Sequence, residues 1–225
     1  AYNFDVEINE DSLNIHLNET YKNLDASAVI KLELGKSLYD ALNINLVNGV
    51  IEIEDVDFSS SDIDTVNTKV NIINSQGNLD IDNVNGKLDL KNTNGYLNVE
   101  NVNGTIYLSN ISGDGAKVKS TSGNIRVDGL SSTEFKAENS SGNIRIYNIK
   151  DVEEIDLNSG SGNIVIDADS FDENIKANVV SKDLVFADKY KNKVEKDQGY
   201  EISTSIDEAK LNIDIIAPFG KVSLR

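Results

Sequence analysis

The chain has 225 residues with a formal net charge of −17, one Pro, one His and neither Cys nor Met. The charge argues against nucleic acid and against an anionic membrane surface, because both are bound through clustered Lys and Arg. Without Cys there are no disulfides, thiolate metal sites or Cys nucleophiles, and no apolar run approaches the ~18 residues of a membrane span. We therefore expect neither a nucleic-acid partner nor direct membrane insertion of this chain.

Residues 1–48 contain short runs in which apolar and polar residues alternate, as in strands with one buried face. The apolar positions are Phe4/Val6/Ile8, Leu13/Ile15/Leu17, Val29 to Leu34 and Ile44/Leu46. We expect a small antiparallel meander that covers the first coil of a repetitive body, because a bare coil end exposes unpaired strand edges.

The segment from Gln76 to Ile111 repeats itself every nine residues. Offsets 0 and 2 of each unit alternate as in a half-buried strand, and offset 5 precedes a turn that contains Asn-Gly or Ser-x-Gly. Self-similarity at a fixed period is typical of a solenoid, in which one repeat cannot bury its own apolar face. The residues at these offsets are Leu79/Ile81/Val84, Leu88/Leu90/Thr93, Leu97/Val99/Val102 and Ile106/Leu108/Ile111.

The same pattern begins near Asn48 and continues to Val180, with longer units after Ile111. In this later part the Gly marker appears in every second unit, at Gly123, Gly142 and Gly162, with spacings of 19 and 20 residues. We infer that one structural coil contains two units and that these Gly lie above one another.

The two corners of the predicted coil change in opposite directions along the chain. We interpret this compensation as a core whose cross-section stays filled at constant density. One series runs from Val66, Val84 and Val102 to Thr121, Ser140 and Gly160, and the other from Ser75 and Thr93 to Ile111, Leu130 and Ile149.

Residues 187–200 are highly charged and end in Gln198-Gly199, which indicates a solvated loop or an extended hairpin tip. Further along, apolar positions alternate on both sides of Pro218-Phe-Gly220. They predict two closing strands that form the far cap, with Leu211/Ile213/Ile215 in one and Val222/Leu224 in the other.

Together these patterns predict an all-β fold, a parallel β-helix-like solenoid with coils of about 18–20 residues and antiparallel caps at both ends. The whole chain, 1–225, is then one domain, with cap strands in 1–48, the repeat body in 49–186, and the charged loop and closing strands in 187–225. The calcium-binding nonapeptide roll has the same period but needs Gly-Gly-x-Gly-x-Asp. Only Gly113-Asp114-Gly115 comes close to it, so we expect no metal and no cofactor.

Candidate catalytic groups are few. His16 is the only His, and its apolar neighbours place it on the outward side of a cap strand. Asp62 and Asp80, and likewise Glu134 and Glu154, share an outward offset one coil apart. Coils lie ~4.8 Å apart, near the separation of the carboxyl pair in retaining glycosidases. A polysaccharide-active enzyme is therefore an alternative, but any acidic solenoid stacks carboxylates, and we assign no catalytic residue.

A more specific signal is an outward ladder on the other face. Two of the three Arg of the chain, Arg126 and Arg145, stack there beside Tyr107 and Tyr147. Planar guanidinium groups and aromatic faces suit carboxylate-bearing glycans or an acidic partner segment. The alternative is that each Arg only offsets neighbouring carboxylates. The full ladder is Asp89, Tyr107, Arg126, Arg145 and Val165, and the carboxylates in reach are Asp89, Asp128 and Asp167.

Three segments carry a resemblance to a known family: Val29 to Ile53, the serial Ser/Asn-x-Gly-Asn-Ile-x-Ile repeats, and the closing Phe219-Gly-Lys-Val. They resemble a bacterial β-strand-repeat family that is labelled adhesin and is a domain of unknown function. The resemblance implies a single-domain β-solenoid in bacterial envelope or exported proteins, and it carries over no catalytic motif.

The chain begins at Ala1, and we interpret it as a processed or trimmed product whose leader or anchor is absent. With the implied family, this predicts an extracytoplasmic protein, exported or anchored at the cell surface. We expect a non-enzymatic, adhesin-like binding or scaffold module that contacts a glycan or another surface protein. The alternatives are a self-assembling structural solenoid and the polysaccharide-active carboxylate enzyme.

Overall fold

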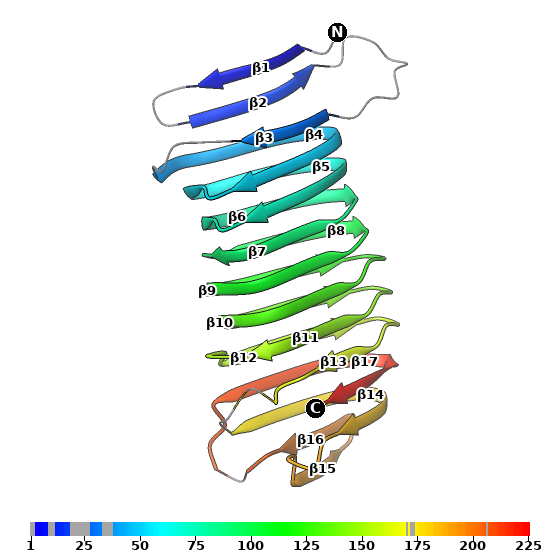
Figure 1. Ribbon diagram of the computed structural model, residues 1–225. Coiled ribbons are helices and arrows are strands. Elements are labelled where there is room, and N and C mark those ends of the chain that lie inside the picture. Colours follow the sequence, from blue (N-terminus) through cyan, green and yellow to red (C-terminus); the bar gives the residue numbers. More distant parts are fainter. Residues whose placement is uncertain are drawn as a thin grey trace.

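The computed structural model describes residues 3–8, 12–18, 28–32, 38–169, 171, 174–205 and 207–225, with side chains from residue 38 onward. It is all-β, with 76% strand and no helix in the described ranges, and forms a parallel β-solenoid of about 7 turns with roughly 19-residue coils (Figure 1). The predicted fold class is confirmed. The side chain of His16, and with it the expected outward position, lies outside the described residues.

The described residues form seventeen strands that are joined in one sheet. The strands up to the middle of the stack are β1 (Asn3–Ile8), β2 (Ser12–Asn18), β3 (Ala28–Leu32), β4 (Leu38–Glu54), β5 (Asp57–Ile73), β6 (Gln76–Asn85), β7 (Leu88–Asn94), β8 (Leu97–Asn103) and β9 (Ile106–Ser120). The remaining strands are β10 (Ile125–Asn139), β11 (Ile144–Ile149), β12 (Glu154–Ser159), β13 (Ile164–Ile166), β14 (Ile175–Phe186), β15 (Asn192–Lys196), β16 (Gly199–Ser203) and β17 (Leu211–Leu224).

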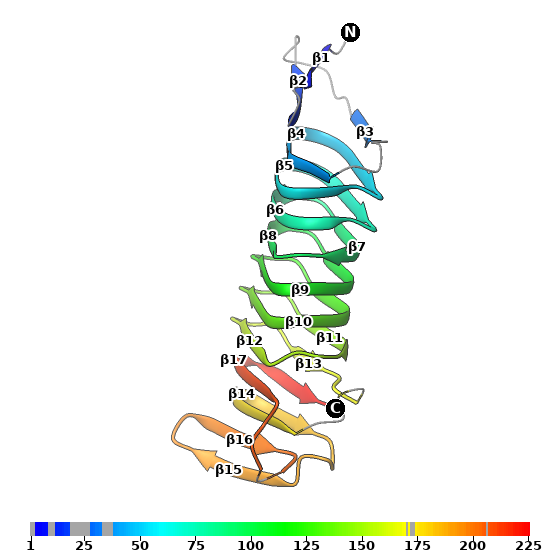
Figure 2. The ribbon, with the colours of Figure 1, turned by 90° about the vertical axis from the view of Figure 1, so that its left-hand side faces the viewer.

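Each coil contributes one strand segment to each of two opposed faces (Figure 2). Face 1 contains β6, β8 and β12, and face 2 contains β7, β11 and β13. The longer strands β4, β5, β9, β10, β14 and β17 bend round a corner and pair within both faces, as the parallel registers β4–β5 and β9–β10 show. Two units of the sequence repeat therefore form one coil.

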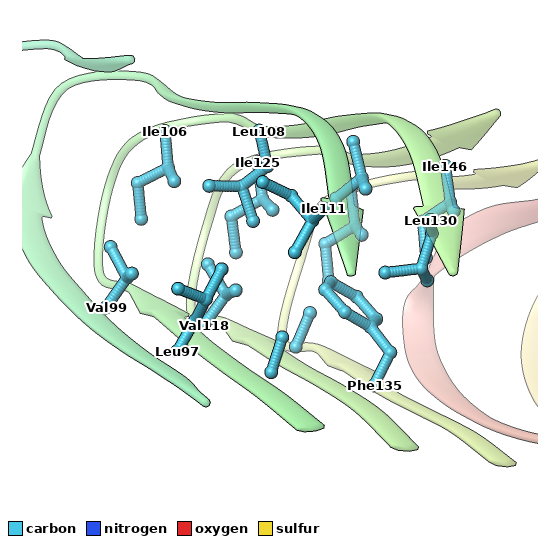
Figure 3. Packing of buried hydrophobic residues seen from close by; sticks show 14 of the residues in the cluster. Leu97, Val99, Ile106, Leu108, Ile111, Val118, Ile125, Leu130, Phe135 and Ile146 are labelled. Carbon is cyan, nitrogen blue, oxygen red and sulfur yellow. The ribbon is translucent and has the colours of Figure 1, made fainter. Parts of the chain in front are cut away.

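The core lies between the two faces and is one column of mainly aliphatic side chains. Residues at offsets 0 and 2 point inward, so that Leu97 and Val99 of face 1 meet Ile106 and Leu108 of face 2 (Figure 3). All four side chains are fully buried. Removing this apolar surface from water is the main stabilising contribution, at roughly 25 cal/mol per Å².

The corner that follows face 1, called corner 1, differs from the prediction. Val66, Val84 and Val102 are 38%, 39% and 41% exposed, so these Val do not fill the core. The polar residue before each of them is buried instead: Asn83 donates its side-chain amide to the carbonyl of Thr68 at 3.1 Å, and Asn101 to that of Gly86 at 2.9 Å. The turn carbonyl needs a donor, and an amide supplies it where a valine cannot.

The corner that follows face 2, called corner 2, agrees with the prediction. The side chains of Ser75, Thr93, Ile111, Leu130 and Ile149 are all buried.

Asn residues just before corner 2 adopt a left-handed backbone, with φ of 53° at Asn74, 52° at Asn92 and 53° at Asn110. Asn tolerates this conformation better than most residues. Their side chains form a ladder in which Asn92 donates to Asn74 at 2.7 Å and accepts from Asn110 at 2.9 Å. These ladder bonds link successive coils outside the core.

Gly residues stack along corner 1. A Cβ built on Gly123 would lie 1.5 Å from the carbonyl oxygen of Gly104, and one on Gly142 would lie 1.7 Å from that of Gly123. The same relation joins Gly162 to Gly142 at 1.8 Å and Gly220 to Gly162 at 1.9 Å. The predicted superposition of Gly123, Gly142 and Gly162 is confirmed. These positions require Gly because the coils approach one another too closely there to admit a Cβ.

At the amino-terminal end, β1 and β2 form the expected antiparallel hairpin. Parallel pairing starts earlier than the predicted boundary at residue 49, because β2 and β3 each pair in parallel with one half of β4. β4 in turn pairs with β5 from Leu38 onward. Residues 38–48 are therefore part of the stacked coils rather than of a cap.

At the other end, the prediction that residues 211–224 form the far cap is wrong. β17 lies inside the stack, paired in parallel with β12 and β13 on one side and with β14 on the other. The alternating apolar residues of β17 fit an internal coil as well as a terminal one. The cap is the β15–β16 hairpin, which pairs antiparallel with the first part of β14. The hairpin expected near residues 187–200 is thus present, and it covers the end of face 1.

Candidate functional site

The four predicted site residues lie together on the outer surface of face 2. Parallel register pairs Tyr107 of β9 with Arg126 of β10, and Arg126 with Arg145 of β11. Tyr147 stands two residues beyond Arg145 on the same strand and pairs with Asp128. We call Tyr107, Arg126, Arg145 and Tyr147 the Arg-Tyr patch. Its register is the one expected from the repeat, because inward residues fix the outward ones on a pleated strand.

Arg126 is the centre of the patch. The carbon of its guanidinium lies 5.8 Å from the ring centre of Tyr107 and 5.2 Å from that of Tyr147. These distances are within the range of cation–π attraction. Its guanidinium also lies 3.8 Å from a carboxylate oxygen of Asp128. Two aromatic rings and one carboxylate therefore restrict the rotamers of this exposed side chain.

Arg145 has a different environment. It is exposed and neighbours Arg126 in the ladder on one side and Val165 on the other. Among the described residues it forms no ion pair and no ring contact. Arg126 thus pairs with a local carboxylate, as the alternative reading expects, whereas Arg145 forms no such pair among the described residues. Its five donors are available to a planar carboxylate.

Two further residues belong to this surface, and the sequence reasoning did not include them. Lys87 lies 5.7 Å from the ring centre of Tyr107 and pairs with Asp89, so Asp89 is neutralised by Lys rather than by Arg. Asn148 donates to Asp128 at 2.6 Å and holds the carboxylate that faces Arg126. Strict alternation places Lys87 on the outward side together with Asp89, and that signal identifies it.

The carboxylate pairs considered for catalysis are in register, Asp62 with Asp80 and Glu134 with Glu154. Burial, and then the nearby Asp64 and Asp80, raise the pKa of Asp62 above its ordinary value. In the part of the chain that the structure describes, no group of three or more Asp, Glu, His or Cys side chains is arranged to hold a metal ion.

The architecture defines the class of protein: a β-solenoid with two flat outer faces and a hairpin at each end. The chain belongs to the Toastrack DUF4097 family, whose model matches residues 94–225, more than half of the sequence. This is a family of unknown function with a β-solenoid-like fold. Both points agree with the family resemblance seen in the sequence. The match includes the whole Arg-Tyr patch and β17.

A search of the curated proteins and a search of the solved structures each found no match. Over the described residues, no helix is long and apolar enough to cross a membrane.

Proposed function

We propose that the chain is a non-enzymatic, adhesin-like binding and scaffold module, and that the Arg-Tyr patch contacts a carboxylate-bearing glycan or an acidic segment of another surface protein. We place the module outside the cytoplasm, exported or anchored at the cell surface, because the resemblance implies a bacterial envelope or exported protein. The observation that carries the proposal is Arg145, an exposed Arg with no ion pair in the described structure, beside an Arg held between two Tyr rings.

The chemistry of the patch favours a planar anion over a point charge. A guanidinium presents its donors in a fork that matches a carboxylate in bidentate geometry. Tyr107 and Tyr147 are half-buried and offer flat apolar area beside the charge, which suits a sugar ring or a short peptide. Because successive coils repeat at about 4.8 Å, a long ligand meets several groups of the rigid ladder at once, and avidity replaces a deep pocket.

The ends of the solenoid favour binding over end-to-end assembly. The β1–β2 hairpin lies at one end. At the other end, the outer strand β15 carries Lys193, Glu195 and Lys196 in exposed positions. Charged edge strands are a common protection against pairing with another chain. Light scattering at increasing protein concentration checks this: we expect a constant mass, and growth with concentration favours the self-assembling alternative.

The binding experiment uses an array of acidic and neutral glycans and a pull-down on bacterial cell walls. We expect acidic glycans to bind, and Arg126→Ala/Arg145→Ala to weaken binding at least about tenfold, because two charge-assisted contacts are lost. Arg126→Lys/Arg145→Lys keeps the charge and loses the planar fork, so it restores only part of the affinity.

The matched control is Lys69→Ala/Lys150→Ala, which removes two positive charges from exposed positions outside the patch. It leaves binding unchanged if the patch is the contact site. Equal binding by wild type and the double Arg variant would remove the patch from the proposal. Equal losses in the Arg and Lys variants would show attraction by net charge alone.

A further inference from the structure

A groove runs along corner 1 over several coils, away from the Arg-Tyr patch. It has a volume of about 630 Å³ and lies over β4, β5, β6, β8 and the second half of β9. Its walls are of two kinds, an exposed apolar ladder and a row of acidic side chains. The lining residues that carry the argument are Val66, Val84, Val102, Asp64, Asp82 and Glu100.

The apolar wall is a ladder of Val side chains that point outward from the core, which we call the Val ladder. Val47, Val66, Val84 and Val102 occupy the same position in four successive coils and are 51%, 38%, 39% and 41% exposed. Single exposed Val are common on protein surfaces, but here the repeat joins them into one strip beside the groove. In the following coils Thr121, Ser140 and Gly160 take this position, and the strip ends.

The acidic wall is a row of carboxylates in register. Asp64 pairs with Asp82, and Asp82 with Glu100, on successive strands of face 1. Glu100 lies 3.7 Å from Lys119. Within the described ranges, neither Asp64 nor Asp82 forms an ion pair. Burial raises the pKa of Asp82 above its ordinary value, and Glu100, Asp80, Asp64 and Asp62 add to this through their charge.

We infer that this groove binds a linear aliphatic polyamine, with its ammonium groups on the row Asp64, Asp82 and Glu100 and its methylene segments on the Val ladder. Carboxylates repeat once per coil, about 4.8 Å. Two amines joined by three carbons are separated by four bonds of about 1.5 Å, which span about 5 Å when extended. The spacing of the charges in such a ligand therefore equals the spacing of the charges in the wall.

The groups that line the groove are spread over several coils, as an extended ligand requires. Compact divalent cations fit less well, because no metal-holding group of side chains is present in the described part of the chain.

The experiment is calorimetric titration with bis(3-aminopropyl)amine at low ionic strength. We expect it to bind wild type, and Asp64→Asn/Asp82→Asn to lower the affinity at least about tenfold. The comparison ligand is a triamine with six-carbon spacers, in which amines lie about 9 Å apart; it has the same charge, and we expect it to bind more weakly. Methyl NMR of Val84 and Val102 provides a second readout, since their resonances shift on binding.

The matched control is Glu134→Gln/Glu154→Gln, which removes two carboxylates from adjacent coils of the same face but outside the groove. The inference predicts unchanged affinity for this variant. Val84→Ser removes one rung of the apolar wall and is expected to weaken binding while thermal melting stays close to wild type. Equal losses in the two carboxylate variants, equal binding of the two triamines, or no binding at all would each overturn the inference.

Discussion

The amino-terminal coils, through β9, and the coils from β9 to β13 follow the same backbone path, but they hold corner 1 together in different ways. In the amino-terminal coils, Asn67, Asn85 and Asn103 bond to one another outside the turn at 2.9 Å. In the later coils, Asn139 inside the turn donates to the carbonyl of Gly123, as Asn101 does to that of Gly86, and it also accepts the N–H of Gly142 at 2.7 Å.

The difference shows that the turn needs its backbone groups satisfied but does not dictate by which residues. The outer side of the corner is then free to specialise. In the amino-terminal coils it carries Val and faces a row of carboxylates, whereas in the later coils it carries Thr, Ser and Gly. The two candidate sites occupy different parts of the stack accordingly, the groove over β4 to β9 and the Arg-Tyr patch over β9 to β11.

The largest expected effect concerns the Gly stack of the later coils. Gly123→Ala places a Cβ 1.5 Å from the carbonyl oxygen of Gly104, and two coils must separate to admit it. We expect the free energy of unfolding to fall by about 3 kcal/mol, measured as a lower urea midpoint at constant m-value.

Gly115→Ala is the matched control, since the nearest atoms belong to the Tyr96 side chain at 3.0 Å, which can move. It is expected to cost under about 1 kcal/mol. Similar losses in the two variants would contradict the close approach of coils at Gly123.

A smaller effect is expected in the external Asn ladder of corner 2. Asn92→Ala puts Ala, whose side chain cannot form a hydrogen bond with the local backbone, at a φ of 52°. It also removes the two ladder hydrogen bonds of Asn92. The cost is about 1–2 kcal/mol for the left-handed backbone, with a further contribution from the bonds. Asn92→Gly avoids backbone strain at this positive φ, so its loss of stability reports the ladder hydrogen bonds alone. If both variants are equally destabilised in urea, backbone strain is not the cause of the preference for Asn.

The smallest effect is electrostatic. Asp82 has a raised pKa in the folded state, so its contribution to stability is complete below its unfolded pKa and is lost as pH rises through the folded value. Asp82→Asn should therefore be more stable than wild type at pH 7, by at most about 0.5 kcal/mol because solvent screens the charge. This advantage shrinks toward pH 4, as thermal melting at the two pH values will show.

Asp156→Asn is the control with the opposite sign, because Asp156 pairs with Lys136 at 2.9 Å. The pKa of Lys136 is raised by its hydrogen bond to Asp156 and by the charge of that carboxylate, as expected for a favourable pair. A variant that loses it is slightly less stable at pH 7. An Asp82→Asn protein that is also destabilised there would refute repulsion within the acidic row.

Much of this fold follows from local patterns. Alternation identifies the inward residues at offsets 0 and 2 in the described repeat coils, and the Gly spacing identifies the coil length, so the ladder Tyr107–Arg126–Arg145 is predicted in its correct register. Register can be predicted this far because a shift by one residue would turn every apolar side chain outward.

Two features could not be predicted by the same reasoning. Hydrophobicity favours a buried Val84, but the hydrogen bond from Asn83 to a turn carbonyl decides which side chain enters the core. The place of β17 is not encoded in its own pattern, because an alternating strand fits equally well inside the stack or at its end. Its neighbours are determined by tertiary pairing alone.

The position of β17 has a consequence for synthesis and assembly. A chain made from its amino terminus presents residues 175–186 before residues 211–224, yet the later segment lies between β13 and β14. Until residues 211–224 are synthesised, β14 lacks its native partner β17 and is free to pair with β12 in the position that β17 later occupies. Folding is therefore completed by inserting β17 between β13 and β14 rather than by adding one more layer at the end. A nascent or heated chain in which this position is empty can accept the same segment from a neighbouring molecule.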